Sequence, residues 1–177
     1  FGERGIEGKI RAIQYARENK VPYLGLCLGL QLMVVEYARN VCGFKDANST
    51  EFNKKTPHPV VDILPDQLKI VKLGGTMRLG EYDCVLKKST IAQKAYKSES
   101  VMERHRHRYE VNPSYVKELE NRGLIVSGLY KKNDTIVEIT EWKDSFGIAT
   151  QAHIELKSRL EAPAPIFVAF MEAAKKK

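Results

Sequence analysis

The sequence predicts an α/β fold with a parallel sheet and an antiparallel insertion. Apolar residues recur at helical spacing over Ile6–Asn19, a short apolar run follows at Val21–Leu26, and a second helical segment covers Leu28–Arg39. This helix, strand, helix order is what a parallel sheet with crossover helices requires. After Asn40 the pattern changes to short strand-like runs separated by polar turns, which is typical of an antiparallel insertion.

The later strand-like runs are rich in β-branched and aromatic residues and are bounded by turn residues. They cover Val60–Leu64, Leu68–Leu73, Cys84–Leu86, Leu124–Tyr130 and Ile136–Trp142. A helix is expected over Pro113–Asn121. A last apolar run, Phe146–Ala152, ends at His153, and an amphipathic helix follows Pro165. Because no linker divides the sequence, we treat residues 1–177 as one domain.

Composition excludes several classes of protein. No apolar run reaches the length of a membrane span, so we expect no membrane partner. The three cysteines form no CxxC pair, which argues against a disulfide framework or a zinc site and favours the reducing cytoplasm. The net charge of +7 would suit nucleic acid, but aromatic residues are thinly interleaved among the basic ones, so we expect no nucleic-acid partner.

Cys27 lies where the first strand meets the second helix, with Gly25 and Gly29 two positions to either side. This is the spacing of a nucleophile elbow, with cysteine in place of serine. In such a sharp turn, side chains at the two glycine positions would collide. The helix N-terminus points at the sulfur, and its dipole is expected to favour the thiolate. A buried structural cysteine is the alternative interpretation.

A cysteine nucleophile needs a base and a group that orients the base. Of the four histidines, His58 lies between two prolines in a loop, whereas His105 and His107 are expected on one face of a strand. His153 directly follows a strand, where α/β sheets present catalytic groups. Glu155, two residues later, can reach back to its imidazole. Alone, this pair could be two solvated loop residues; with the elbow, a Cys–His–Glu triad is favoured.

Five stretches carry a resemblance to a known family. They are GLCLGLQL (Gly25–Leu32), ANSTEF (Ala47–Phe52), LGGTMRLG (Leu73–Gly80), ERHRHRYEVNP (Glu103–Pro113) and QAHIELKSR (Gln151–Arg159). On these motifs the chain resembles the class I glutamine amidotransferase domains of CTP synthases. The elbow and the His-x-Glu pair mark class I amidotransferases in general, whereas the middle three stretches are specific to the CTP synthase members. The resemblance implies a flavodoxin-like fold.

The resemblance also implies a mechanism. The sulfur of Cys27 would attack the side-chain carboxamide of L-glutamine, and the Leu28 N–H would help to hold the oxyanion. His153 would protonate the departing ammonia and then activate water against the γ-glutamyl thioester, while Glu155 orients its ring. Where the family usually has proline between these two residues, the chain has Ile154, and we expect a looser but intact triad.

Residues that bind glutamine can be assigned by the same resemblance. Gln31 and the backbone of Leu28, Gly29 and Leu30 match the family's contacts to the substrate. Glu51, in the NSTEF stretch, matches the acid that recognises the α-ammonium group. Arg108 matches the arginine associated with the α-carboxylate or with the loop around it. The alternative for Glu51 and Arg108 is a solvated charge on a loop or strand.

The opening FGERGIEG resembles the family loop associated with GTP, the allosteric activator, and Phe1, Arg4, Gly5 and Glu7 are the matching residues. The glycines that precede this loop in the family are absent, as are the elements before them. We therefore interpret the chain as an N-terminally truncated domain and, unless a longer chain supplies the rest, expect poor stability and weak activity.

The resemblance implies no cofactor and no metal in this domain. Ammonia would pass to a synthase domain of the same longer chain, outside this sequence, which uses ATP and Mg²⁺ to aminate UTP to CTP. Two other interpretations stay open. One is a catalytically silent regulatory module of such a chain, and the other is a different Cys–His hydrolase of the same fold that acts on peptides or γ-glutamyl compounds.

Overall fold

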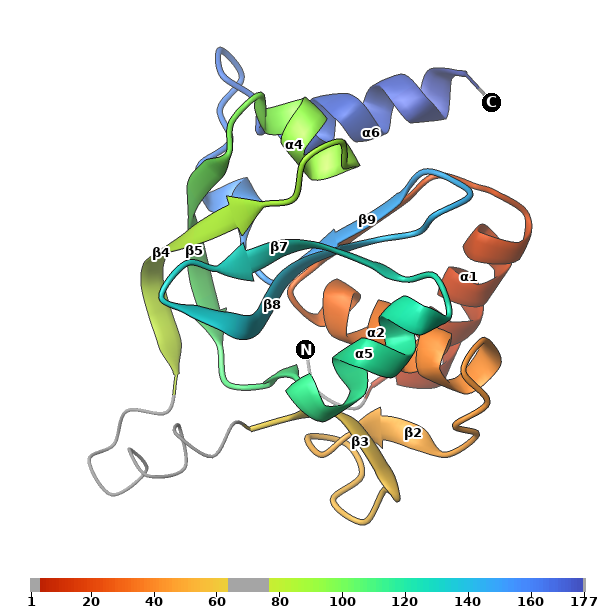
Figure 1. Ribbon diagram of the computed structural model, residues 1–177. Coiled ribbons are helices and arrows are strands. Elements are labelled where there is room, and N and C mark those ends of the chain that lie inside the picture. The colour runs from red at the N-terminus through yellow and green to blue at the C-terminus, as the bar shows by residue number, and fades with distance from the viewer. Residues whose placement is uncertain (1–3, 64–76, 177) are drawn as a thin grey trace.

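The computed structural model describes residues 4–63 and 77–176 (Figure 1). The helices are α1 (Ile6–Glu18), α2 (Leu28–Asn40), α4 (Ile91–Tyr96), α5 (Pro113–Asn121) and α6 (Pro165–Lys175), with a 3₁₀ turn, η2 (Ile154–Leu156). The strands are β1 (Tyr23–Leu26), β2 (Ala47–Ser49), β3 (His58–Asp62), β4 (Arg78–Leu86), β5 (Ser100–His107), β6 (Glu110–Val111), β7 (Ile125–Tyr130), β8 (Asn133–Glu141) and β9 (Gly147–Thr150).

The predicted α/β class is confirmed, but the main sheet is largely antiparallel. Its six strands lie in the order β1-β9-β8-β7-β4-β5, and only the β1–β9 pair among them is parallel. Short turns join β7 to β8 and β8 to β9, and strands joined in this way must run antiparallel. A smaller sheet, β2-β3-β6, lies beside it, and in it β2 and β3 are parallel.

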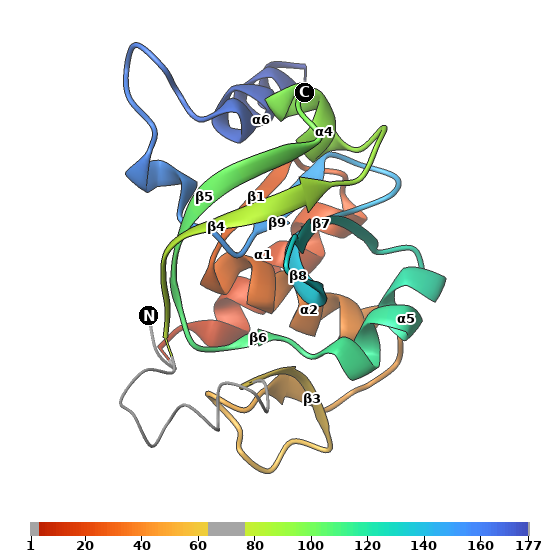
Figure 2. The ribbon, with the colours of Figure 1, turned by 60° about the vertical axis from the view of Figure 1, so that its left-hand side comes forward.

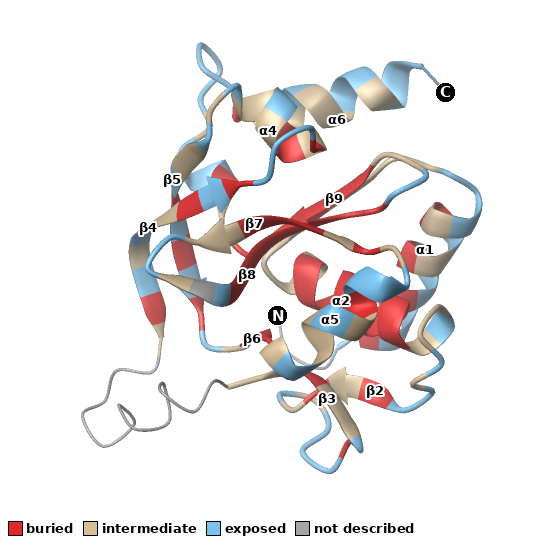
Figure 3. Cartoon of the chain, in the orientation of Figure 1, coloured by how far each residue is buried: buried red, intermediate tan, exposed pale blue. Residues whose placement is uncertain are grey.

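Helices cover both faces of the main sheet. On one side α1 packs on α2 over a core of residues such as Leu32, Val34 and Ala149. On the other side α4 and α6 cover a second core that includes Ile148, Ile154 and Ile166 (Figure 2). Figure 3 shows the buried residues concentrated in α2, β8 and β9, and of these β9 pairs with β1 while α2 packs against it.

Most predicted elements are confirmed with small shifts at their ends. The helix over Pro113–Asn121 is found with the same bounds, because the Asn112 side chain accepts a hydrogen bond from the Ser114 N–H and proline occupies the first turn. The predicted strand at Leu68–Leu73 lies outside the described residues. Cys84–Leu86 is only the end of the nine-residue strand β4.

Candidate active site

Cys27 joins β1 to α2 in a backbone conformation that non-glycine residues rarely adopt, with φ 50° and ψ −100°. Its N–H donates to the Thr150 carbonyl at 2.8 Å, and its own carbonyl accepts from the Leu30 N–H at 3.0 Å. A Cβ on Gly25 would lie 2.7 Å from the Gly29 carbonyl carbon. The close approach of these two glycines is the geometry that an elbow needs.

We expect Gly25→Ala to destabilise the fold by about 2–3 kcal/mol, because the new methyl group would meet backbone that cannot move cheaply. Gly29→Ala is the matched control: its Cβ would meet only the Tyr23 hydroxyl, at 3.3 Å. Urea unfolding of both variants measures the difference. Equal loss in the two variants would contradict this account of the elbow.

His153 stands at the start of η2, three residues after β9 ends at Thr150. Its Nδ1 hydrogen-bonds Glu155 Oε1 at 2.6 Å, and its backbone N–H donates to the Arg104 carbonyl of β5 at 2.7 Å. Ile154, between the two, is fully buried in the second core and anchors the turn. The Nε2 of His153 is buried and, among the described residues, has no hydrogen-bond partner. That nitrogen is therefore available to a reacting group.

One cleft, of about 640 Å³, brings most of the predicted residues together. It is lined by Cys27, Leu28, Gln31, Glu51, Met77, Arg106, His107, Arg108, Tyr109, His153, Glu155 and Leu156. The predicted nucleophile, base, orienting acid and two charged binding residues thus share one space. The side chain of Leu30 is buried in the core and does not line the cleft, which is consistent with the backbone role expected of it.

Burial overturns the expectation of a resting thiolate. Together with smaller effects of the nearby carboxylates Glu155 and Glu51, burial raises the pKa of the Cys27 thiol to about 11. The Leu28 N–H and the Gln151 amide lower this pKa, but by less than burial raises it. The thiol is therefore protonated near neutral pH, and attack requires a base rather than a preformed thiolate.

Gln151 is a site residue that the sequence did not reveal. Its amide is fully buried, and Nε2 lies 3.6 Å from the Cys27 sulfur as a donor. Gln31 in turn donates from its Nε2 to Gln151 Oε1 at 3.4 Å and to the Tyr109 carbonyl at 3.1 Å. Because the protein already engages the Gln31 amide nitrogen, its carbonyl oxygen is the group left for a ligand. Burial also raises the pKa of Glu51.

The residues matched to the GTP loop lie elsewhere. Gly5 precedes α1 with φ 75°, and Glu7 forms an ion pair with Arg39 of α2 at 3.0 Å. Arg4 is exposed, and its carbonyl accepts from Lys9 Nζ at 3.5 Å. None of these three residues lines the cleft. Phe1 lies outside the described residues.

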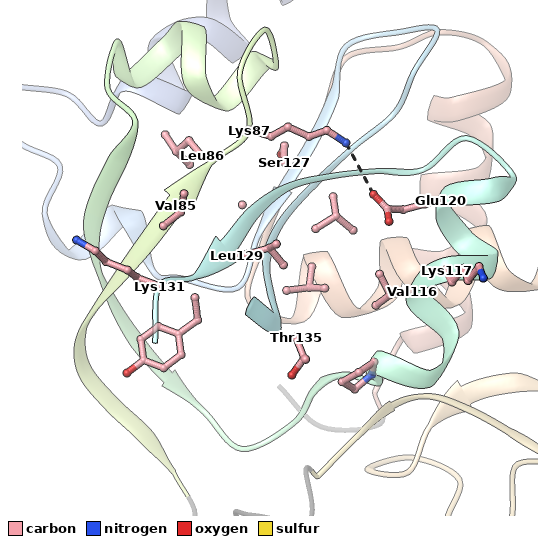
Figure 4. A pocket seen from close by; sticks show the side chains of 15 residues that line it. Val85, Leu86, Lys87, Val116, Lys117, Glu120, Ser127, Leu129, Lys131 and Thr135 are labelled. Atoms are coloured by element: carbon pink, nitrogen blue, oxygen red, sulfur yellow. Dashed lines mark ion pairs between the residues drawn. The ribbon is translucent and has the colours of Figure 1, made fainter. Parts of the chain in front are cut away.

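A second cavity, of about 620 Å³, opens between α5 and the strands β4, β7 and β8 (Figure 4). Its lining is largely apolar, and Lys87 and Glu120 form an ion pair across it at 3.9 Å. It contains none of the predicted site residues. In the described part of the chain no three His, Cys or carboxylate side chains are grouped as a metal site would require. Nor is any helix there long and apolar enough to span a bilayer.

An elbow cysteine and a histidine–carboxylate pair thus line one cleft of an α/β fold, an arrangement typical of enzymes with a thiol nucleophile. The sequence profile described as "Glutamine amidotransferase class-I" matches residues 1–173. The chain belongs to this family. It is 57% identical over 177 residues to the CTP synthase of Archaeoglobus fulgidus, and 56% identical over 179 residues to that of Thermus thermophilus.

These matches cover 99% and 98% of the chain but only 33% and 32% of the relatives, so the chain spans about a third of their length. Among solved structures, the glutaminase domain of Trypanosoma brucei CTPS with bound acivicin superposes with a TM-score of 0.94 at 45% identity. It is matched over 100% of this chain and 69% of that one. Within its family the chain therefore corresponds to the glutaminase domain of CTP synthases.

Proposed function

We propose that this domain hydrolyses L-glutamine to glutamate and ammonia through a Cys27–His153–Glu155 triad. The observation that carries the proposal is the shared cleft, in which the elbow cysteine and the His153–Glu155 pair meet Glu51 and Arg108. One carboxylate and one guanidinium suit the α-ammonium and α-carboxylate groups of a free amino acid. A peptide substrate would lack one or both of these charges.

The first step moves the thiol proton. As the Cys27 sulfur attacks the carboxamide carbon, His153 Nε2 takes the proton, and Glu155 stabilises the resulting imidazolium through Nδ1. The Leu28 N–H, at the start of α2, stabilises the oxyanion. Gln151 donates to the sulfur while its charge develops. This order follows from a thiol that is protonated at rest.

The second step breaks the C–N bond. His153 returns its proton to the leaving ammonia, which leaves a γ-glutamyl thioester on Cys27. The neutral imidazole then takes a proton from water, which attacks the thioester carbon. The sulfur leaves as the thiolate and regains its proton from His153, so the site returns to its starting state. Glutamate and ammonia are the products.

In the longer protein, ammonia would pass to a synthase domain of the same chain that uses ATP and Mg²⁺ to aminate UTP, in pyrimidine biosynthesis. The length of the curated relatives supports this part of the proposal. GTP would activate the reaction through the segment that contains Phe1, Arg4, Gly5 and Glu7. Three free cysteines suit the reducing cytoplasm.

The test is glutamine hydrolysis by the full-length protein, with glutamate and ammonia measured together. We expect the two products in equal amounts. In Glu51→Gln we expect the KM for glutamine to rise about tenfold or more with a smaller change in kcat, because the lost charge acts mainly in binding. Asparagine serves as the control substrate. Equal use of both amides, or an unchanged KM, would contradict the proposal.

A further inference from the structure

Behind the cleft, four buried side chains form a continuous row. Arg78 of β4 donates to Glu138 Oε1 of β8 at 2.7 Å. Glu138 Oε2 lies 3.4 Å from His105 Nε2 of β5 but, among the described residues, has no hydrogen-bond partner as it stands. His105 Nδ1 then lies 2.9 Å from His107 Nε2, and His107 Nδ1 lies 3.1 Å from the Tyr109 carbonyl. All four side chains are at most 8% exposed.

The Tyr109 carbonyl at the end of the row determines which ring nitrogens carry hydrogens. A carbonyl oxygen can only accept, so His107 Nδ1 must carry a hydrogen. The Nε2 of a neutral His107 is then bare and must accept from His105 Nδ1–H. That leaves the Nε2 of a neutral His105 bare as well, facing Glu138 Oε2. Two lone pairs would meet there if Glu138 were ionised, and a buried mismatch of this kind is costly.

We propose that one extra proton is held between Glu138 Oε2 and His105 Nε2, and that it fixes His107 as a positioning residue for the nucleophile. With this proton present, every contact from Glu138 to the Tyr109 carbonyl has one donor and one acceptor. Without it, neither atom of the contact between Glu138 Oε2 and His105 Nε2 carries a hydrogen to donate. The row thus has a single hydrogen-bond direction, which runs from Glu138 toward the cleft.

The surroundings place the proton at the Glu138 end. Burial, together with the Arg78 guanidinium, lowers the pKa of both imidazoles, that of His105 to about 3, so cationic rings are disfavoured. Burial raises the pKa of Glu138, although Arg78 acts in the opposite direction. Among the described residues, the row also faces the ionisable groups Glu110, Tyr82, Tyr130, Cys84 and His153.

The row ends on the hydrogen bonds that reach Cys27. The Tyr109 carbonyl accepts from both His107 Nδ1 and Gln31 Nε2. Gln31 also donates to the side-chain oxygen of Gln151, Oε1. This bond turns the Gln151 Nε2 toward the sulfur. The importance of this orientation for catalysis rests on the proposed function, whereas the protonation state of the row is independent of that function.

Nitrogen-15 NMR of the full-length protein tests the protonation state directly. We expect Nδ1–H in both His105 and His107 and a bare Nε2 in His107 at neutral pH. Glu138→Gln provides the decisive variant, since its amide can donate to His105 Nε2 without titrating. In Glu138→Gln the same pattern should persist to higher pH than in the unchanged protein. A protonated Nε2 on His107, or loss of the pattern in Glu138→Gln, would overturn the proposal.

The rate of Cys27 alkylation by iodoacetamide, measured against pH, tests the positioning role without glutamine turnover. His107→Asn places an amide N–H near the position of Nδ1, so the pH at which alkylation reaches half its maximal rate (the midpoint) should match that of the unchanged protein. His107→Leu removes the donor and should shift the midpoint to higher pH, because the Gln151 amide is no longer held toward the sulfur. Equal midpoints in the two variants would overturn the role. A failure of glutamine hydrolysis would leave both measurements standing.

Discussion

Replacing Cys27 by serine is expected to lower glutamine hydrolysis by the full-length protein by about 10³-fold or more. A serine hydroxyl is a much weaker acid than a thiol, so His153 would take its proton far less readily. The hydroxyl also makes a poorer leaving group when water attacks the acyl intermediate. Product formation under saturating glutamine measures the loss.

Cys42→Ser is the matched control for this experiment. Cys42 is also a free, half-buried cysteine, and burial raises its pKa to about 11 as well, but it follows α2 and does not line the cleft. Its replacement should leave hydrolysis within about twofold of the unchanged protein. Substantial activity in Cys27→Ser, or equal losses in the two variants, would show that the elbow cysteine is not the nucleophile.

The largest loss of stability is expected for Arg78→Leu, at about 3–5 kcal/mol. The guanidinium binds Glu110 at 3.2 Å and Glu138 at 2.7 Å, and it stacks over the rings of Tyr82 and Tyr130. Leucine can replace part of the packing but not the charge. Glu110 and Glu138 would lose the hydrogen bonds that the guanidinium donates to them, and unmade hydrogen bonds are costly in a buried setting.

The loss in Arg78→Leu should be nearly independent of pH between about 4 and 7. A carboxyl whose folded-state pKa exceeds its unfolded value stabilises the fold at low pH and loses that contribution as pH rises. Burial raises the pKa of Glu138, and in the proposed row this group already holds a proton at neutral pH. The unchanged protein and the variant should therefore lose this contribution alike over that range.

Denaturant unfolding across this pH range measures the effect, with Lys131→Met as the control. Lys131 binds Asp83 at 2.9 Å, but its side chain is 58% exposed, and such pairs contribute less than about 1 kcal/mol. A loss in Arg78→Leu no greater than that in the control, or a loss that changes strongly between pH 4 and 7, would contradict this account of Arg78 and Glu138.

Local patterns were sufficient to predict the elements that carry Cys27 and His153. Cys27 sits between two glycines whose approach only an elbow explains, and α5 has a capping asparagine followed by proline. His153 follows a strand and pairs with a carboxylate two residues away. Each of these features depends on neighbours in sequence, and short-range geometry determines it.

Features that depend on distant segments were missed. Gln151 reaches the sulfur only because β9 lies beside β1, and neither strand alone indicates that pairing. The resting thiol was mispredicted because helix dipole and spacing are visible in sequence, whereas burial is not. Strand β5 was recognised only in its histidine alternation, since its exposed face is charged, and α4 is too short for a helical period.

Covalent labelling of the full-length protein by a glutamine-mimicking chloroketone tests the central claim most directly. The claim is that Cys27 reacts within a cleft that recognises free glutamine. It predicts that mass spectrometry will find the label on Cys27 and that added glutamine will block it. Absence of the label from Cys27 would contradict the claim, and so would labelling that glutamine does not slow.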